Sequence, residues 1–324
     1  MQHIVHYNDT IIINNNIQEI IIDELICPLD NLPPTVRKIT IKKSKNIYRR
    51  QNKIPYDCKL IIKNIQINNI NIFNNMKEED YLDITELYLY GNVITSIPES
   101  ICSLVNLQQL YLSNTRITSI PESFSLLVNL QILNLSYNYI TSIPESICSL
   151  VKLQILNLSY NCITSISPSI GLLINLYKLE LCTNYITRIP KSIGSLVNLQ
   201  ELYLSTNQIT SIPESIGSLI NLQILYLSDN KIISIPKFIG SLINLQILHL
   251  NTNKITNIPE SISLLVNLEI LELSYNKISS IPKSISSLIN LQELYLNKNQ
   301  ITNIPESIKN KPYLKLKKKR KINY

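Results

Sequence analysis

The sequence predicts a single α/β solenoid, with short parallel strands forming an inner sheet and irregular or 3-10 segments forming the outer side. Three observations support this prediction. A 23-residue period runs through most of the 324-residue chain, leucine-type residues alternate as in a strand with one buried face, and an asparagine recurs at a fixed place after that alternation.

The period is regular enough to define a repeating unit, L-x-x-L-x-L-x-x-N-x-I-x-x-I-P-x-x-I-x-x-L-x-N. A unit this short cannot bury its apolar residues alone, so neighbouring turns are expected to stack. The first position recurs every 23 residues without an insertion, at Ile84, Leu107, Leu130, Leu153, Leu176, Leu199, Leu222, Leu245, Leu268 and Leu291.

The asparagine column completes the pattern. It comprises Asn92, Asn138, Asn161, Asn184, Asn207, Asn230, Asn253, Asn276 and Asn299, with Thr115 as the exception. These residues resemble the leucine-rich repeat family over about 225 residues, and the I-P-E-S-I that follows is similar to the intracellular, Ras-group type. The resemblance implies a horseshoe-shaped solenoid. It also implies an asparagine ladder that bonds the backbone of the turns, in which Thr115 is a weaker rung.

The Ile-Pro step should turn the chain onto the outer face, because proline fixes φ and cannot donate a hydrogen bond. One unit departs from this pattern. In Ile166-Ser167-Pro168 the proline moves one place on, and we expect a local distortion there without a change of register.

The ends divide the chain into a degenerate N-terminal cap (1–83), ten regular repeats (84–308) and a C-terminal cap strand with a basic tail (309–324). A separate small N-terminal domain is the alternative for residues 1–83. Three upstream segments match the strand pattern: Ile17-x-x-Ile20-x-Ile22, Val36-x-x-Ile39-x-Ile41 and Ile62-x-x-Ile65-x-Ile67. Downstream, Leu314-x-Leu316 is expected to begin an eleventh strand.

Composition restricts the function. The net charge of +7 lies almost wholly in residues 309–324, which hold eight Lys/Arg and no Asp/Glu, so the body is a poor binder of duplex nucleic acid. We expect no secretory signal and no membrane insertion. The amino-acid composition, which includes no alanine and no tryptophan, indicates an AT-rich genome, such as that of a large DNA virus of amoebae. A cytoplasmic location is expected. The basic segment from Lys315 to Lys321 resembles a nuclear-localisation signal, which makes the nucleus an alternative location, or it forms a solvated end cap.

No constellation predicts catalysis, a cofactor or a metal site. Cys102 and Cys148 share a repeat position with glycines and serines, which predicts a packing role. His249 has no acid or nucleophile at a fixed spacing, and Glu269 with Glu272 fit an exposed polar strand better than acid–base chemistry.

The outward strand positions predict a partner-binding surface. They carry Tyr88, Tyr111, Tyr203, Tyr226, His249 and Tyr295, and a column of Lys231, Lys254 and Lys277 follows three adjacent strands. Tyrosine is enriched at interfaces, although codon bias with repeat duplication is an alternative. The lysines could meet an acidic partner or simply be solvated. We therefore expect a monomeric, non-catalytic scaffold that binds a protein on its concave face. The alternatives are the recognition arm of a ubiquitin ligase, docked through residues 1–83, and a polyanion-binding protein acting through its tail.

Overall fold

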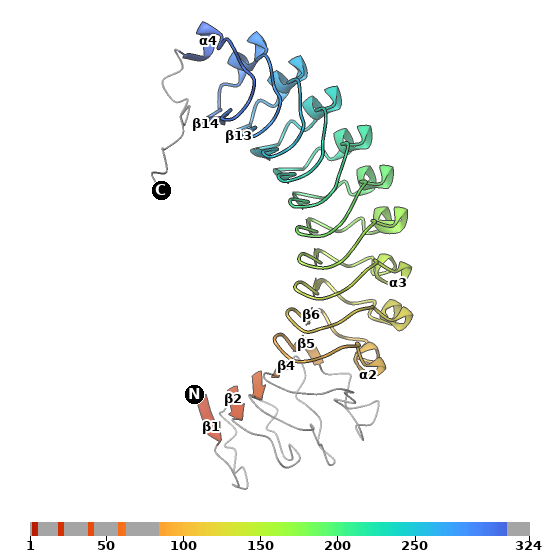
Figure 1. Ribbon diagram of the computed structural model, residues 1–324. Coiled ribbons are helices and arrows are strands. Elements are labelled where there is room, and N and C mark those ends of the chain that lie inside the picture. The colour runs from red at the N-terminus through yellow and green to blue at the C-terminus, as the bar shows by residue number, and fades with distance from the viewer. Residues whose placement is uncertain (1, 6–18, 23–37, 42–57, 63–83, 310–324) are drawn as a thin grey trace, which may run out of the picture. The chain divides into compact units, whose positions relative to one another are not determined.

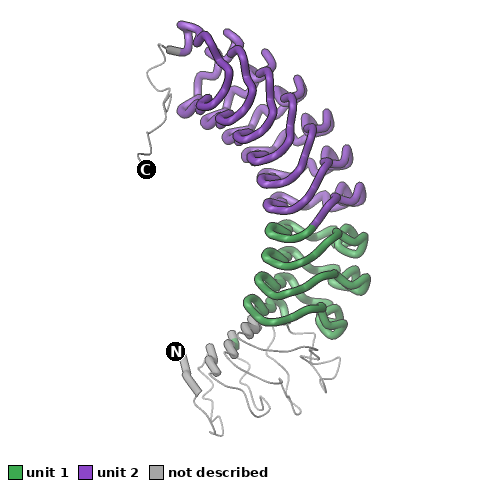
Figure 2. Tube along the Cα trace, viewed as in Figure 1, with its two compact units in different colours: residues 1–162 green, residues 163–324 purple. Residues whose placement is uncertain are grey.

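The computed structural model describes residues 2–5, 19–22, 38–41, 58–62 and 84–309 (Figure 1). The chain separates into two compact units, Met1–Cys162 and Ile163–Tyr324 (Figure 2). In each unit one turn of chain carries a strand on one side and, in the regular repeats, a short helical segment on the other.

Among its described residues, unit 1 has eight strands that pair in chain order, all parallel. They are β1 (Gln2–Val5), β2 (Glu19–Ile22), β3 (Lys38–Ile41), β4 (Cys58–Ile62), β5 (Ile84–Tyr88), β6 (Gln109–Tyr111), β7 (Ile132–Asn134) and β8 (Ile155–Asn157). The outer segments are α2 (Glu99–Cys102), η1 (Glu122–Leu126) and α3 (Glu145–Cys148), where η denotes a 3-10 helix.

Unit 2 repeats the same turn, and residues 163–309 contain six strands, also parallel and in chain order. They are β9 (Lys178–Glu180), β10 (Glu201–Tyr203), β11 (Ile224–Tyr226), β12 (Ile247–His249), β13 (Ile270–Glu272) and β14 (Glu293–Tyr295). The outer segments are η2 (Pro168–Leu172), η3 (Lys191–Ser195), η4 (Glu214–Ser218), η5 (Lys237–Ser241), η6 (Glu260–Leu264), η7 (Lys283–Ser287) and α4 (Glu306–Lys309).

The strand register follows the 23-residue period, so equivalent leucines lie side by side. Leu202 of β10, for example, is opposite Leu179 on one side and Leu225 on the other. The regular turns before the last one bury equivalent apolar residues, which in the β10 turn are Leu199, Leu202, Leu204, Ile209, Ile212, Ile216 and Leu219. Burying one such side chain stabilises the fold by about 1.5–3 kcal/mol, and the burial is complete only when the adjacent turns are in place.

The outer segment is preceded by a proline in extended conformation, which its fixed φ permits. Pro213, with φ of −70° and ψ of 153°, precedes η4, and its carbonyl accepts the first 3-10 bond from the amide of Ile216 at 3.1 Å. The prediction of a local distortion at the displaced proline is wrong. Ser167 takes the capping place and its hydroxyl accepts from the amide of Ser169, while Pro168 becomes the first residue of η2, where a missing N–H costs nothing.

One repeat position in the outer segments before α4 carries only glycine, serine or cysteine, and its surroundings explain how these segments pack. A Cβ on Gly194 would lie 2.6 Å from the carbonyl oxygen of Ser215 in the next outer segment. Cys102 and Cys148, which occupy the same column in α2 and α3, are buried. Close approach of neighbouring outer segments therefore restricts this position to small side chains.

The N-terminal strands differ in part from the expected ones. Strands β2 and β3 coincide with the first two predicted segments, whereas β1 was not predicted. The third prediction is wrong, because Leu60 of β4 lies opposite Leu87 of β5 where Ile65 was expected. The run Leu60-Ile61-Ile62 is at least as apolar as the predicted run Ile65-Gln66-Ile67. Pairing with β5 selects the earlier of the two.

Other expectations at the ends lie outside the described residues. These are the eleventh strand at Leu314-x-Leu316 and the basic segment from Lys315 to Lys321. The division into cap, ten repeats and tail stays a prediction. In the described part of the chain, no helix combines the length and apolar character needed to cross a bilayer.

Candidate functional site

The candidate site is the strand face, by which we mean the first and third residues of the three-residue strands and their equivalents in β5. In every such strand the middle leucine is buried, while the residues on either side are half-buried and point outward. This alternation places consecutive outward residues in columns that run across the strands.

In unit 1 the strand face begins with a tyrosine pair. The rings of Tyr88 and Tyr111 stack with centroids 4.4 Å apart and planes inclined by 11°. The hydroxyl of Tyr88 donates to the Glu86 carboxylate at 2.9 Å, and that of Tyr111 donates to the Gln109 Oε1 at 3.1 Å. Burial, followed by the bond to Glu86, raises the pKa of Tyr88 to about 12. Both rings are thus held in place by a residue of their own strand.

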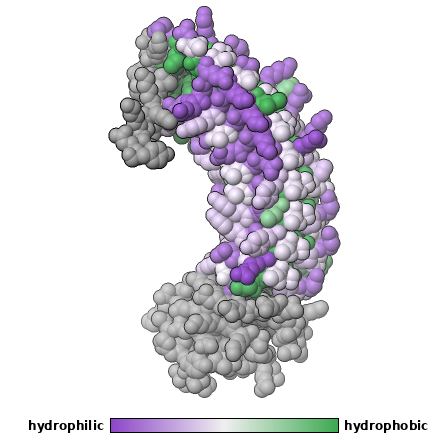
Figure 3. Space-filling model, viewed as in Figure 1, coloured by the Kyte–Doolittle hydropathy of each residue, from purple (hydrophilic) through white to green (hydrophobic). Residues whose placement is uncertain are grey.

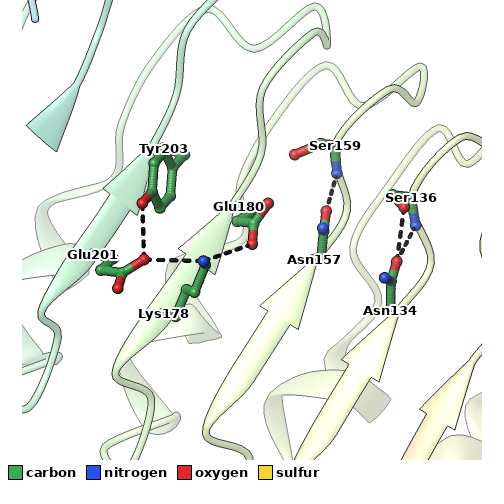
Figure 4. A network of polar contacts seen from close by, with 8 residues as sticks. All are labelled: Asn134, Ser136, Asn157, Ser159, Lys178, Glu180, Glu201 and Tyr203. Atoms are coloured by element: carbon green, nitrogen blue, oxygen red, sulfur yellow. Dashed lines mark hydrogen bonds and ion pairs between the residues drawn. The ribbon is translucent and has the colours of Figure 1, made fainter. Parts of the chain in front are cut away.

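The side chains of the next two outward residues of unit 1 accept hydrogen bonds from the backbone just after their own strands. The Oδ1 of Asn134 accepts from the amide of Ser136, and that of Asn157 accepts from the amide of Ser159, each at 3.0 Å (Figure 4). These contacts close the turns that follow β7 and β8. The two asparagines therefore contribute to the local turn geometry.

In unit 2 a charged network holds the first tyrosine of the strand face. The Nζ of Lys178 lies 3.3 Å from a Glu180 oxygen and 3.0 Å from a Glu201 oxygen, and the Tyr203 hydroxyl donates to the Glu201 carboxylate at 2.8 Å (Figure 4). The same Nζ is 5.1 Å from the centroid of the Tyr203 ring. Burial opposes the charge on Lys178, but the two glutamates outweigh it and raise its pKa. Burial and the bond to Glu201 raise the pKa of Tyr203.

An aromatic column continues from Tyr203 across the next two strands. Tyr226 meets Tyr203 edge to face, with centroids 5.0 Å apart, and stacks on His249 at 4.3 Å with planes inclined by 3°. Burial lowers the pKa of His249, so the imidazole is neutral at neutral pH. Tyr295, on β14, donates its hydroxyl to Glu293. The structure thus brings three of the predicted partner-binding residues of this unit into one continuous group of rings.

The predicted lysines do not belong to the strand face. Lys231, Lys254 and Lys277 each follow a ladder asparagine, lie in the loops after β11, β12 and β13, and are exposed. The Nζ of Lys231 donates to Gln208 Oε1 at 3.1 Å. They border the strand face on its loop side.

The asparagine column forms a ladder inside the stack. The Nδ2 of Asn207 donates to the carbonyl of Leu181 in the preceding turn at 2.9 Å and to that of Leu204 in its own turn at 3.1 Å. Its Oδ1 accepts from the amide of Ile186 at 3.0 Å. At the exception, the Thr115 hydroxyl has a single proton and contacts only the carbonyl of Leu112, in its own turn, and the Oδ1 of Asn138.

Sequence reasoning missed a second ladder. The asparagine at the end of the repeat unit donates its Nδ2 to a carbonyl 24 residues earlier, as in Asn221 to Val197 and Asn244 to Ile220, both at 2.8 Å. The column was visible in the repeat, but its bond to the preceding turn was not. Where Lys152 replaces the asparagine, its Nζ donates to Asn129 Oδ1 at 2.8 Å.

A strained column was also missed. The residue before each position of the asparagine column, Thr115 included, has positive φ, which is between 52° and 58° at nine described non-glycine positions. The β-branched Thr183, Thr206 and Thr252 are among them, although such residues rarely adopt this conformation. The repeated turn therefore imposes its backbone geometry on whatever residue stands there.

An apolar column is unexpectedly exposed. The β-branched residue before each asparagine of the second ladder is exposed, for example Ile220 at 53% and Ile243 at 51%. On the face shown in Figure 3, hydrophobic residues appear as separate green patches among pale and purple ones.

The cysteines and acids show no reactive arrangement. Burial raises the pKa of Cys102 and Cys148 to about 11, which keeps both thiols protonated. The described residues contain no group of three or more His, Cys, Asp or Glu side chains placed to hold a metal ion.

Comparisons with known proteins agree with this geometry. A leucine-rich repeat family model matches residues 82–140, 174–232 and 238–308, and a two-copy leucine-rich repeat model matches residues 128–171. No curated protein sequence gives a significant match.

Solved structures provide the remaining matches. A leucine-rich repeat protein of Leptospira interrogans is 30% identical with a TM-score of 0.66, and the match covers 86% of this chain and 78% of that one. An internalin of Listeria monocytogenes is 25% identical with a TM-score of 0.65, and the match covers 81% and 82%. The Arabidopsis receptor kinase HAESA, solved with a peptide hormone and a co-receptor, is 29% identical with a TM-score of 0.63, and the match covers 86% of this chain and 44% of that one. Repeat period, strand register and family models together establish that the chain belongs to the leucine-rich repeat family.

Proposed function

We propose that this chain is a non-catalytic scaffold that recognises a partner protein through its strand face. The observation that carries the proposal is the column of Tyr203, Tyr226 and His249, whose rings are in mutual contact, half-buried and directed outward. Two of the similar structures support the class of function, since one is an internalin and the other was solved with a peptide hormone.

The column suits recognition because its side chains are ordered before a partner arrives. Tyr203 is fixed at its hydroxyl by Glu201 and at its ring by Lys178 and Tyr226. Side chains held in this way lose little rotamer entropy on binding, so more of the contact energy contributes to affinity. Aromatic anchors of this kind commonly cost about 2 kcal/mol or more of binding when truncated, roughly thirtyfold in affinity.

The test compares two double variants of unit 2 in quantitative pull-downs. Tyr203→Ala with Tyr226→Ala removes the anchors, whereas Tyr185→Ala with Tyr275→Ala removes two tyrosines that are each 53% exposed and lie off the strands. We expect both to keep the melting temperature within a few degrees. Only the first should lose most of the capture of specific partners.

The opposite pattern would overturn the proposal. Capture that is indifferent to the strand tyrosines, but is lost when the basic residues from Lys315 to Lys321 are neutralised, would favour the tail as the binding element. Such binding to a polyanion would weaken steeply with salt. No observation favours a ubiquitin-ligase arm, because the described parts of residues 1–83 are strands.

We also propose the 23-residue intracellular repeat type and a cytoplasmic place of action. The support is the unbroken 23-residue spacing and the I-P-E-S-I segment. Fractionation of the native cell, with an antibody against this chain, tests the location.

A further inference from the structure

The strand face of unit 2 carries its charges at both ends and none in the middle. Its outward residues on β9 and β10 include Lys178, Glu180 and Glu201, and those on β13 and β14 include Glu272 and Glu293. Four glutamates against one lysine give a formal charge of −3. Both ends of the face are therefore acidic, and Lys178 offsets part of the charge at one end only.

The middle of the face is apolar and aromatic. Strands β11 and β12 contribute Ile224, Tyr226, Ile247 and His249, and β13 adds Ile270 beside them. All five are half-buried. The isoleucines form one column and the rings form the other, so the central surface offers aliphatic and aromatic contacts side by side.

The glutamates at the β13–β14 end retain capacity for a cation. Glu272 accepts a hydrogen bond from the amide of Ser274 at 2.8 Å, and Glu293 accepts one from the hydroxyl of Tyr295. A carboxylate can accept about four hydrogen bonds. Within residues 84–309, neither carboxylate forms an ion pair, so an incoming ammonium or guanidinium group would find an unneutralised acid.

We propose that the strand face of unit 2 binds an extended segment of a partner protein that has an aliphatic residue at its centre and a lysine or arginine on each side. The inference rests on the proposed function and adds the chemistry of the partner. The occupant is argued from charge complementarity: two acidic ends attract cations, and the uncharged centre accommodates an apolar side chain.

The strand spacing sets the spacing of the recognised residues. Glu201 of β10 and Glu272 of β13 are three strands apart, about 14 Å at about 4.8 Å per step, and two residues apart along the strand direction, about 7 Å, which makes about 16 Å in all. An extended chain advances about 3.3 Å per residue, and its alternate side chains face the same way. Four residues span about 13 Å, and the long lysine or arginine side chains can cover the remaining few ångströms. The pattern is therefore cation-x-aliphatic-x-cation, with all three named side chains facing the sheet.

The lysines in the loops beside the strand face restrict where a basic segment can lie. Lys231, Lys254 and Lys277 are exposed in the loops that follow β11, β12 and β13. Like charges repel, so a basic segment is kept over the strands and away from these loops. An acidic segment would be drawn to the lysines instead, away from the aromatic column.

The test uses synthetic peptides and the full chain. The probe is fluorescein-labelled Ser-Gly-Lys-Thr-Leu-Thr-Lys-Gly-Ser, measured by fluorescence anisotropy at low salt. One comparison peptide replaces both lysines by glutamate, and another places the two lysines next to each other. We expect the probe to bind at least about tenfold more tightly than either, because only its cations can reach both acidic ends at once.

Variants of the chain locate the binding. Glu272→Gln and Glu293→Gln should each weaken the probe about three- to fivefold, as expected for a partly exposed ion pair. Glu214→Gln is the matched control, since Glu214 is an exposed glutamate on the outer segment η4, and it should leave binding unchanged. Circular dichroism of each variant checks that the fold is retained.

Three results would overturn the inference. They are equal or tighter binding of the glutamate peptide, equal binding of the peptide with adjacent lysines, and binding that is insensitive to Glu272 and Glu293. A chain ending at Lys309 that binds the probe tenfold more tightly would also overturn it, because residues 310–324 would then be the natural occupant. Each result leaves the proposed function standing if the double variant of Tyr203 and Tyr226 still loses partner capture.

Discussion

Replacing Asn207 by alanine tests the ladder directly. The change removes two donated bonds, to the carbonyls of Leu181 and Leu204, and one accepted bond from the amide of Ile186. The two donated bonds contribute about 2 kcal/mol net, and leaving the Ile186 amide without its partner costs about 1–3 kcal/mol. We therefore expect the free energy of unfolding to fall by about 3–5 kcal/mol.

The chain supplies its own comparison at Thr115. The threonine hydroxyl can donate one bond, so Thr115→Ala should cost only about 1 kcal/mol. Asn207→Thr copies this natural exception and should fall between the two. Thr115→Asn should stabilise the fold, because a full amide can then bond the preceding turn as Asn138 bonds Leu112 at 2.8 Å.

Urea unfolding followed by far-ultraviolet circular dichroism measures these differences, and tyrosine fluorescence is a second probe because the chain has no tryptophan. An unchanged slope against urea would show that stability alone has changed. Equal costs for Asn207→Ala and Thr115→Ala, or a loss of stability in Thr115→Asn, would refute the assigned role of the column.

Three further outcomes are expected. Gly194→Ala should destabilise by about 1–3 kcal/mol and more than Gly217→Ala, because the new Cβ would lie 2.6 Å from a carbonyl oxygen rather than 3.0 Å; urea midpoints check the order. Burial lowers the pKa of His249, so the unfolded chain takes up the proton first as pH falls through about 6.5, and stability should fall over that range in the wild type but less in His249→Gln. Alkylation by iodoacetamide at pH 8, followed by mass spectrometry, should leave Cys102 and Cys148 unmodified until the chain unfolds, because burial raises their pKa to about 11.

The regular repeats could be read from the sequence because each position is specified many times over. Leucine alternation, the asparagine column and the proline step all give the same 23-residue register, and the strands follow it. Upstream of β5 this redundancy is lost. The aligned residues Ile20, Ile39, Leu60 and Leu87 are separated by 19, 21 and 27 positions. Without a constant interval, the sequence favoured Ile62-x-x-Ile65-x-Ile67, which matches the pattern in full, over the run at Leu60, which has Asp57 at its first position. Only pairing with β5 shows that the earlier run forms the strand.

The candidate site was predictable in outline and not in detail. Strand alternation shows that Tyr203, Tyr226 and His249 point outward in one column. The polar contacts that hold Tyr203 were not predictable. Lys178 and Glu201 lie in the other outward column, and their ion pair depends on the conformations of the two side chains. The lysine column was assigned to the same surface by its repeat position, although its members lie in loops.

The ladder bonds to a neighbouring turn join residues only 21 to 26 positions apart. A mean separation near 23 in a chain of 324 residues corresponds to a relative contact order of about 0.07, the range of fast-folding helical bundles rather than of ordinary sheet proteins. Each turn needs only its predecessor to close its hydrogen bonds. A ribosome adds about 5–20 residues per second, so a new turn becomes available every few seconds. The stack can therefore grow during translation, one turn at a time, without waiting for the end of the chain to emerge.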